Sequence, residues 1–181
     1  MVKRYHDDTI TRHSNDLKTI CIYTDGSSIN RKVGAATYIQ EITKKRNLGK
    51  DSDYNVFAGE LTAIDLGIYI IKEANHRYEN CILYIDSQVA IQSIMKPFRQ
   101  SGQQIIQGIH DQIDILNTSI TMIWIPGHMD IPGNEAADEA AKQVVQTEHE
   151  GNNANTNPTP TMKSARNMVI SWRCKEEWDQ R

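Results

Sequence analysis

The sequence predicts an α/β fold with a five-stranded mixed sheet flanked by helices. Three segments of strand character come first along the chain, and this order predicts an antiparallel meander. Helical and strand periodicities then alternate, which indicates further strands connected by helices that cover the sheet. The chain has 181 residues, of which 39% are hydrophobic, so a single core domain is expected.

The first half of the expected domain holds the meander and a long helix. Residues 19–24 (TICIYT) predict an apolar strand, which the turn residues 25–28 (DGSS) are expected to stop. Residues 33–40 predict a second strand, and a third is expected between residues 43 and 54. A helix is expected over residues 57–75, because its apolar residues recur at spacings of three and four. These residues are Phe57, Leu61, Ile64, Ile68 and Ile71.

The second half alternates strands and helices. Residues 81–85 (CILYI) predict a fourth strand, and Ser87 is placed to cap a short helix that ends near Met95. Residues 101–116 carry apolar residues at helical spacing, and residues 120–125 (ITMIWI) predict a fifth strand. An Ala-rich helix is expected over residues 134–148, where small side chains allow a close approach to the sheet.

Composition divides the chain into four parts. Residues 1–17 are expected to be a flexible N-terminal tail, and residues 18–148 the core domain. Residues 149–161 are rich in Asn, Thr and Pro and indicate a linker. Residues 162–181 have an apolar face at helical spacing, so a C-terminal amphipathic helix is expected there.

Charge and cysteine content narrow the class of protein. The net charge is -3, from 20 basic and 23 acidic residues, which argues against a polybasic nucleic-acid binder. Cys21, Cys81 and Cys174 form no CxxC pair, so a reducing, intracellular location in cytoplasm or nucleus is expected. The first residues show no apolar signal segment, and no apolar run is long enough for a membrane helix. Secretion and membrane insertion are therefore not expected.

Four acidic residues stand where the predicted elements converge. Asp25 and Asp86 each follow an apolar strand, and they would lie side by side if the two strands are parallel neighbours. Glu60 is expected to face the sheet from the long helix, and Asp138 from the Ala-rich helix. Each one alone is more simply a surface acid or a helix cap. Together they would repel one another, and no Lys or Arg stands within a few residues, so a hard divalent cation is the natural neutraliser.

Short motifs in a fixed order carry a resemblance to a known family. They are TDGS at 24–27, AGELTA at 58–63, DSQ at 86–88, WIPGH at 124–128 and GNEAAD at 133–138. Over about 130 residues the chain resembles ribonuclease H of type 1. The form is most similar to the ribonuclease H domains of non-LTR retrotransposons, where the domain is joined to a reverse transcriptase.

The resemblance implies an RNase H-like fold and hydrolysis of the RNA strand of RNA–DNA hybrids. Asp25, Glu60, Asp86 and Asp138 would hold two Mg²⁺ ions, with Mn²⁺ as a possible substitute. The products would carry 5′-phosphate and 3′-hydroxyl ends. A single His is usually structural, but the position of His128 implies that it moves protons or assists product release.

The resemblance also implies residues that contact the substrate. Gln88 matches a position that contacts the hybrid, and Ser28 lies in the corresponding turn. Asn55 stands one step before the positions where the family often has Asn. Arg31 belongs to a basic segment around the second and third strands, which suits either phosphate contact or a solvated sheet edge. The expected partners are an RNA–DNA hybrid and a reverse transcriptase domain of the parent polyprotein, and the domain itself is expected to be a monomer.

Two other functions remain open at this point. The chain could be a non-catalytic nucleic-acid-binding or scaffold domain of a retroelement protein, although intact carboxylates argue against that role. It could also be a relative on the same fold that cuts or joins DNA. The helix position of Glu60 and the spacing from His128 to Asp138 argue against this second alternative.

Overall fold

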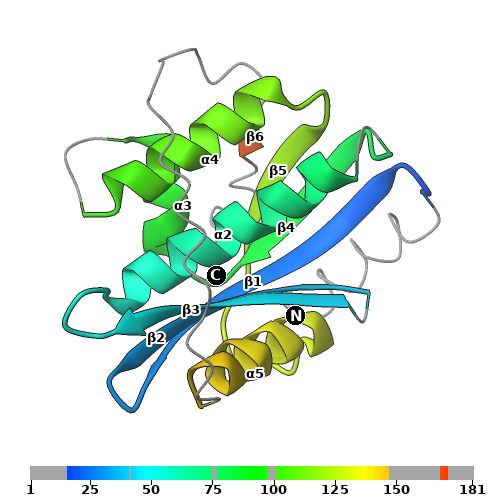
Figure 1. The fold of residues 1–181 in the computed structure, drawn as a ribbon. Helices are drawn as coiled ribbons and strands as arrows, with labels where there is room; N and C mark the ends of the chain where they lie inside the picture. Colours follow the sequence, from blue (N-terminus) through cyan, green and yellow to red (C-terminus); the bar gives the residue numbers. More distant parts are fainter. Residues whose placement is uncertain (1–15, 41, 75–76, 98–100, 147–167, 171–181) are drawn as a thin grey trace, which may run out of the picture.

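A computed structural model describes residues 16–40, 42–74, 77–97, 101–146 and 168–170. Its centre is a mixed sheet with the strand order β3-β2-β1-β4-β5-β6, with helices on both faces (Figure 1). The strands are β1 Thr19–Ile29, β2 Lys32–Ile39, β3 Ile42–Lys50, β4 Asn80–Ile85, β5 Ser119–Trp124 and β6 Met168–Ile170. The first three form the expected antiparallel meander, and β4 and β5 extend the sheet in parallel with β1.

The first strand is longer than the sequence pattern predicts. β1 continues through the DGSS segment as far as Ile29, so the expectation that these residues stop the strand is wrong. The reason is that β2 supplies backbone partners for the whole extension, from Asp25 opposite Ala36 to Ile29 opposite Lys32. The turn falls at Asn30 and Arg31, which both have positive φ angles.

The parallel side of β1 ends earlier than its antiparallel side. The last residue of β4, Ile85, pairs with Thr24, so Asp25 and Asp86 are the first residues beyond this parallel ladder. Asp25 and Asp86 therefore lie side by side just beyond the last parallel pair, as expected from the sequence.

Helices cover the two faces unequally. α2 (Val56–Glu73), α3 (Gln88–Met95) and α4 (Gln103–Ile115) lie on one face, and α5 (Pro132–Gln146) lies on the other (Figure 1). α5 begins two residues before the expected start, because the fixed φ of Pro132 suits the first turn of a helix.

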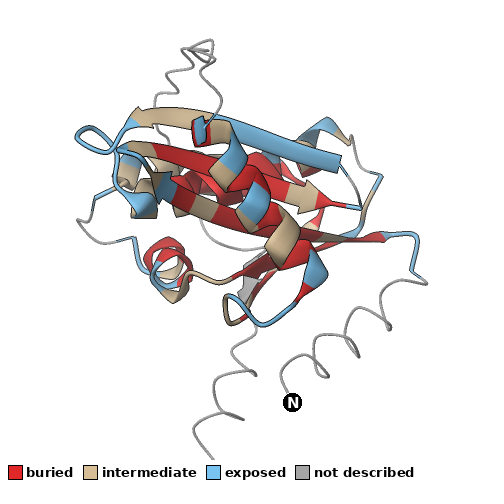
Figure 2. Ribbon diagram, turned by 90° about the horizontal axis from the view of Figure 1, so that it is seen from below, coloured by how far each residue is buried: buried red, intermediate tan, exposed pale blue. Residues whose placement is uncertain are grey.

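The core lies between the sheet and these helices. On the α2 face, the predicted apolar stripe is buried from Leu61 to Ile71, with Leu61, Ile64 and Ile68 fully inaccessible to solvent, and Phe57 at its start is partly buried. Beneath α5, a smaller cluster contains the stacked rings of Tyr23 and Tyr84. Figure 2 shows the resulting band of buried residues along the middle of the sheet.

A sixth strand lies outside the expected sheet. Residues 168–170 pair in parallel with residues 120–122 of β5. The C-terminal helix expected over residues 162–181 is therefore wrong at these three residues. A Met-Val-Ile segment suits a strand, and the edge of β5 offers unpaired backbone groups for it. The remainder of that expected helix, the expected linker and residues 1–15 of the expected tail lie outside the described residues.

Within the described part of the chain, no helix is both long enough and apolar enough to cross a membrane.

Glycines allow α2 to contact β1 through its backbone. A Cβ atom added at Gly26 would lie 2.4 Å from the backbone nitrogen of Glu60 and 2.6 Å from the carbonyl carbon of Gly59. A Cβ at Gly59 would lie 2.9 Å from the carbonyl oxygen of Gly34. This close approach brings the start of α2, and with it Glu60, against the strand that carries Asp25.

Substitution of Gly26 by Ala tests this contact. We expect Gly26→Ala to lower the free energy of unfolding by about 2 kcal/mol or more, because two backbones must separate to admit the methyl group. Gly108→Ala is the matched control: it lies inside α4 with nothing within 4 Å of the added Cβ, so it should raise stability by about 0.5 to 1 kcal/mol. Urea denaturation measures both, and equal stability of Gly26→Ala and the wild type would contradict the close contact.

Candidate metal-binding active site

Three of the predicted acidic residues meet at the end of the parallel strands. Asp25, Glu60 and Asp86 each place a carboxylate oxygen within 4.8 Å of those of the other two. They come from the middle of β1, the second turn of α2 and the residue that follows β4. Residues far apart in the sequence are thus brought together by the crossover from the meander into the parallel strands.

Local contacts fix the direction of the Glu60 side chain. α2 begins after Asn55, whose Oδ1 accepts a hydrogen bond of 2.9 Å from the backbone nitrogen of Ala58. This cap starts the helix close to the sheet. The backbone N–H of Gly26 then donates a hydrogen bond to the Glu60 carboxylate, and this contact lowers the pKa of Glu60 against the larger opposing effects described next.

Burial and mutual repulsion raise the pKa values of this group. Burial, followed by the charges of Asp86 and Asp138, raises the pKa of Asp25 to about 8. Burial, followed by the charges of Asp25 and Asp86, raises the pKa of Glu60 to about 9. Burial also raises the pKa of Asp86. At neutral pH the protein alone therefore holds protons in this cluster.

The free oxygen atoms of the cluster fit a metal ion. Oδ2 of Asp25 and Oε2 of Glu60 are buried and make no hydrogen bond. Buried polar atoms without partners cost stability, whereas a hard divalent cation would use carboxylate oxygens as ligands. The three carboxylates are therefore suited to bind a divalent metal ion.

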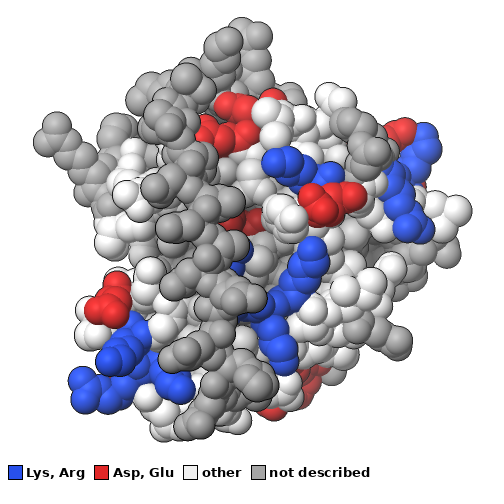
Figure 3. All heavy atoms as spheres, viewed as in Figure 1, with Lys and Arg blue, Asp and Glu red and all other residues white. Residues whose placement is uncertain are grey.

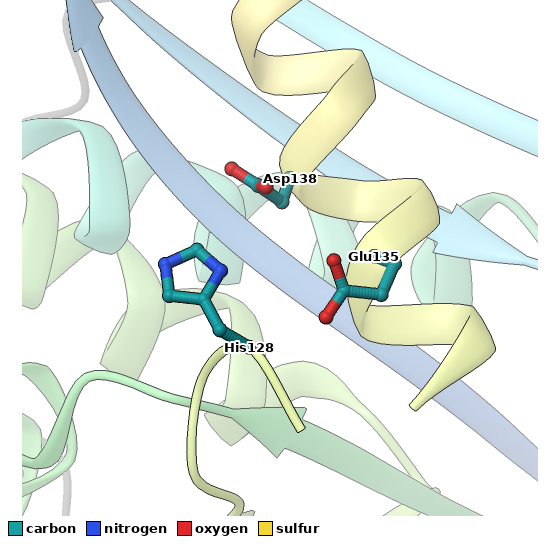
Figure 4. A group of neighbouring side chains, drawn as sticks. All are labelled: His128, Glu135 and Asp138. Atoms are coloured by element: carbon teal, nitrogen blue, oxygen red, sulfur yellow. The ribbon is translucent and has the colours of Figure 1, made fainter. Parts of the chain in front are cut away.

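Asp138 belongs to a neighbouring group of ligands. Its carboxylate, that of Glu135 and the His128 ring have atoms within 4.8 Å of one another, and both acids project from α5 toward the histidine (Figure 4). Asp138 is still close enough to the first cluster to raise the pKa values of Asp25 and Glu60. The four predicted carboxylates thus share one region, divided into a group of three and a second group around Asp138.

His128 lies on the open side of this region. It is exposed and lies in the loop between β5 and α5, with a φ angle of 56°. A positive φ is uncommon for residues other than Gly, and His is among those that adopt it more often. The positive charge of a protonated His128 lowers the pKa of Asp86.

The expectation that no basic residue stands near the acids is wrong at Asp138. Nζ of Lys142 lies 2.5 Å from Oδ2 of Asp138, one helical turn away on α5. An acid followed by Lys four residues later is a recognisable helical pair. This spacing was the signal in the sequence that could have identified Lys142.

Two further residues hold Asp86 in place. The side chain of Asn134, only 3% exposed, donates a hydrogen bond to the Asp86 carboxylate, and this bond lowers the pKa of Asp86. Nε1 of Trp124 donates to the Asp86 backbone oxygen at 3.0 Å. In sequence both residues looked like ordinary helix-start and core positions, because the contacts depend on tertiary packing between α5, β5 and the end of β4.

The residues expected to contact substrate are spread around this centre. Gln88 is the first residue of α3, directly after the Asp86-Ser87 pair, and Asn55 caps α2. Ser28 is exposed on the extension of β1. Arg31 is exposed in the β1–β2 turn, with Nε 3.8 Å from Oδ1 of Asp51. Their contact with nucleic acid stays a prediction.

The basic segment is partly engaged within the protein. Nζ of Lys44 lies 4.9 Å from the centre of the Tyr69 ring, and the charge of Arg46 lowers the pKa of the half-buried Asp65 against the larger effect of its burial. Figure 3 shows basic side chains grouped near the β1–β2 end of the sheet and over its middle, with acidic residues between them. This face therefore carries mixed charge, as a solvated sheet edge often does.

The fold and the site define an α/β protein with a clustered-carboxylate centre at the ends of its parallel strands. The chain belongs to the RNase H family, whose model, described as "RNase H", matches residues 17–146. Two solved structures share the fold. RNase H1 of Halobacterium salinarum is 14% identical with a TM-score of 0.55, over 71% of this chain and 98% of that one. The N-terminal RNase H domain of a Mycobacterium tuberculosis protein is 14% identical with a TM-score of 0.56, over 71% of this chain and 94% of that one.

Proposed function

We propose that this protein is a ribonuclease H that hydrolyses the RNA strand of RNA–DNA hybrids with the help of divalent metal ions. The observation that carries the proposal is the group of Asp25, Glu60 and Asp86 in a chain of the RNase H family, in which Asp25 and Glu60 each have a buried oxygen without a hydrogen-bond partner. A cluster of buried acids costs stability when left alone, which a protein that only binds nucleic acid has no reason to retain.

The proposed division of work follows from the positions of the residues. Asp25, Glu60 and Asp86 would hold Mg²⁺ or Mn²⁺, and Asp138, whose charge reaches Asp25, would add a carboxylate from α5. Bound divalent ions supply activation of the attacking water and stabilisation of the leaving oxygen during phosphoryl transfer. Asn134 and Trp124 keep Asp86 in position through their hydrogen bonds. The products carry 5′-phosphate and 3′-hydroxyl ends.

His128 is proposed to move protons at the edge of the site. It is exposed, and it lies beside Glu135 and Asp138, which can orient the ring. An exposed histidine can exchange protons with solvent while it faces the scissile region.

Substrate choice is proposed to depend on the RNA strand. The 2′-hydroxyl distinguishes RNA from DNA, and Gln88, Asn55 and Ser28 offer the side-chain amides and hydroxyl to recognise such groups. Arg31 would contact a phosphate of the hybrid.

We also propose that the domain belongs to a retroelement polyprotein and works, as a monomer inside the cell, beside a reverse transcriptase. The described residues between Asp86 and Trp124 form α3, α4 and β5 and contain no additional basic helix. With a net charge of -3, the chain has little general attraction for nucleic acid, so a tethered partner would supply part of the substrate binding.

A cleavage assay tests the proposed function. The purified chain is incubated with an RNA–DNA hybrid, duplex RNA and duplex DNA of one sequence, with Mg²⁺, Mn²⁺ or EDTA. We expect cleavage of the RNA strand of the hybrid only, dependent on metal, with 3′-hydroxyl ends that a polymerase can extend. Absence of metal-dependent hybrid cleavage, also when a reverse transcriptase is added, would overturn the proposal, and cleavage of duplex DNA would favour the DNA-cutting alternative.

A further inference from the structure

We infer that Lys142 is a resident counter-cation of the carboxylate site, which competes with the divalent metal for Asp138 and so sets how tightly the site binds that metal. The inference rests on the proposed function, because it concerns the same site. It assigns a role to a residue outside the predicted set of ligands.

The first observation is the contact itself. Nζ of Lys142 lies 2.5 Å from Oδ2 of Asp138, within α5. The Asp138 side chain is 15% exposed and the Lys142 side chain 36% exposed, so the pair lies at the rim of the site rather than free in solvent. The ammonium therefore holds one of the two oxygen atoms through which Asp138 could bind a metal ion.

The second observation is the reach of the charge. The positive charge of Lys142 lowers the pKa of Asp25, a residue of the other carboxylate group. In return, its hydrogen bond with Asp138, together with the charges of Asp138 and Asp25, raises the pKa of Lys142. The Lys142 charge therefore acts on Asp25 as well as on Asp138, which it contacts directly.

Competition follows from these two facts. A metal ion that engages Oδ2 of Asp138 must displace the ammonium, or share the oxygen with it and accept its repulsion. In either case metal binding is weakened by the free energy that the lysine–carboxylate pair contributes to the metal-free protein. A partly exposed ion pair changes an equilibrium constant by a small factor. We therefore expect Lys142 to weaken metal binding by about two- to fivefold.

Metal binding in the absence of nucleic acid is the decisive measurement. Binding of Mn²⁺ to the whole chain is followed by the loss of the free Mn²⁺ signal in electron paramagnetic resonance, at pH 8. We expect Lys142→Gln to bind Mn²⁺ about two- to fivefold more tightly than the wild type, and Lys142→Arg to remain within about twofold of the wild type. Without metal, Lys142→Gln should unfold at a lower temperature than the wild type, and Mn²⁺ should restore more of its stability.

Lys18→Gln is the matched control. Lys18 forms a more exposed ion pair with Glu79 at the start of β1, away from the carboxylate groups, so its loss should leave Mn²⁺ affinity unchanged. Unchanged or weaker Mn²⁺ binding by Lys142→Gln would overturn the inference. An increased KM for the hybrid with unchanged Mn²⁺ affinity would instead assign Lys142 to the substrate phosphate. The binding measurement uses no hybrid, so it tests the role of Lys142 even if the protein does not cleave RNA–DNA hybrids.

Discussion

Asp86→Asn is expected to reduce cleavage of an RNA–DNA hybrid by about a thousandfold or more without lowering the thermal stability of the protein. The activity falls because a neutral amide is a poor ligand for a divalent cation, and phosphoryl transfer at such sites depends strongly on the charge held there. Stability is kept because the variant has the same shape and can still accept the hydrogen bond from Asn134. Burial raises the pKa of Asp86, so the ionised side chain is itself costly to the fold.

The two readouts separate chemistry from folding. Single-turnover cleavage and thermal unfolding should be measured on one preparation, with Glu73→Gln, an exposed position on α2, as the control for loss of an acidic charge. The control should keep wild-type activity. Substantial cleavage by Asp86→Asn would remove this residue from the catalytic group, and a large fall in its melting temperature would mean that the lost activity reflects misfolding.

The stability of the metal-free protein is expected to decrease as the pH rises from about 4 to about 9. In the unfolded chain Asp25 and Glu60 titrate near their ordinary values of 3.8 and 4.5, whereas in the folded protein their pKa values are about 8 and about 9. The folded state therefore binds protons more strongly. The stabilisation from these protons is complete below the unfolded values and is lost as the pH passes the folded values.

This dependence can be assigned to the cluster by comparison. In EDTA, urea denaturation at pH 5 and pH 9 should show a larger loss for the wild type than for Asp25→Asn, with a difference of at least about 2 kcal/mol. Saturating Mg²⁺ should restore stability at pH 9 far more than at pH 5, since metal binds the deprotonated acids. Equal pH dependence in the wild type and Asp25→Asn would mean that Asp25 is ionised in the folded protein at neutral pH.

Local patterns were sufficient to predict the main elements of the fold. The stripe from Leu61 to Ile71 identified α2 because its period reflects burial against one face. The level of Asp25 and Asp86 could also be anticipated, because parallel strands that begin together place the residues after them side by side. These are properties of single elements or of simple pairing.

Features that depend on packing between elements were not accessible in this way. The DGSS segment has turn propensity, yet pairing with β2 keeps it extended, so tertiary structure overrides the local preference. The hydrogen bond from Asn134 to Asp86 requires α5 to lie over the end of β4. Residue spacing in the sequence does not predict this packing. Lys142 is different, because its spacing of four residues from Asp138 on one helix is a local pattern that is visible in the sequence.

The continuation of β1 past its parallel partner has a mechanical consequence. Asp25 is part of a strand whose backbone stays paired with β2 as far as Ile29, rather than part of a loop. Repulsion between Asp25 and its neighbours therefore cannot be relieved by moving the chain, because this would break several backbone hydrogen bonds together. Exchange of protons for metal ions can relieve it without any such movement. We therefore expect metal binding to release protons from the site in proportion to the metal bound, without a change in the backbone conformation.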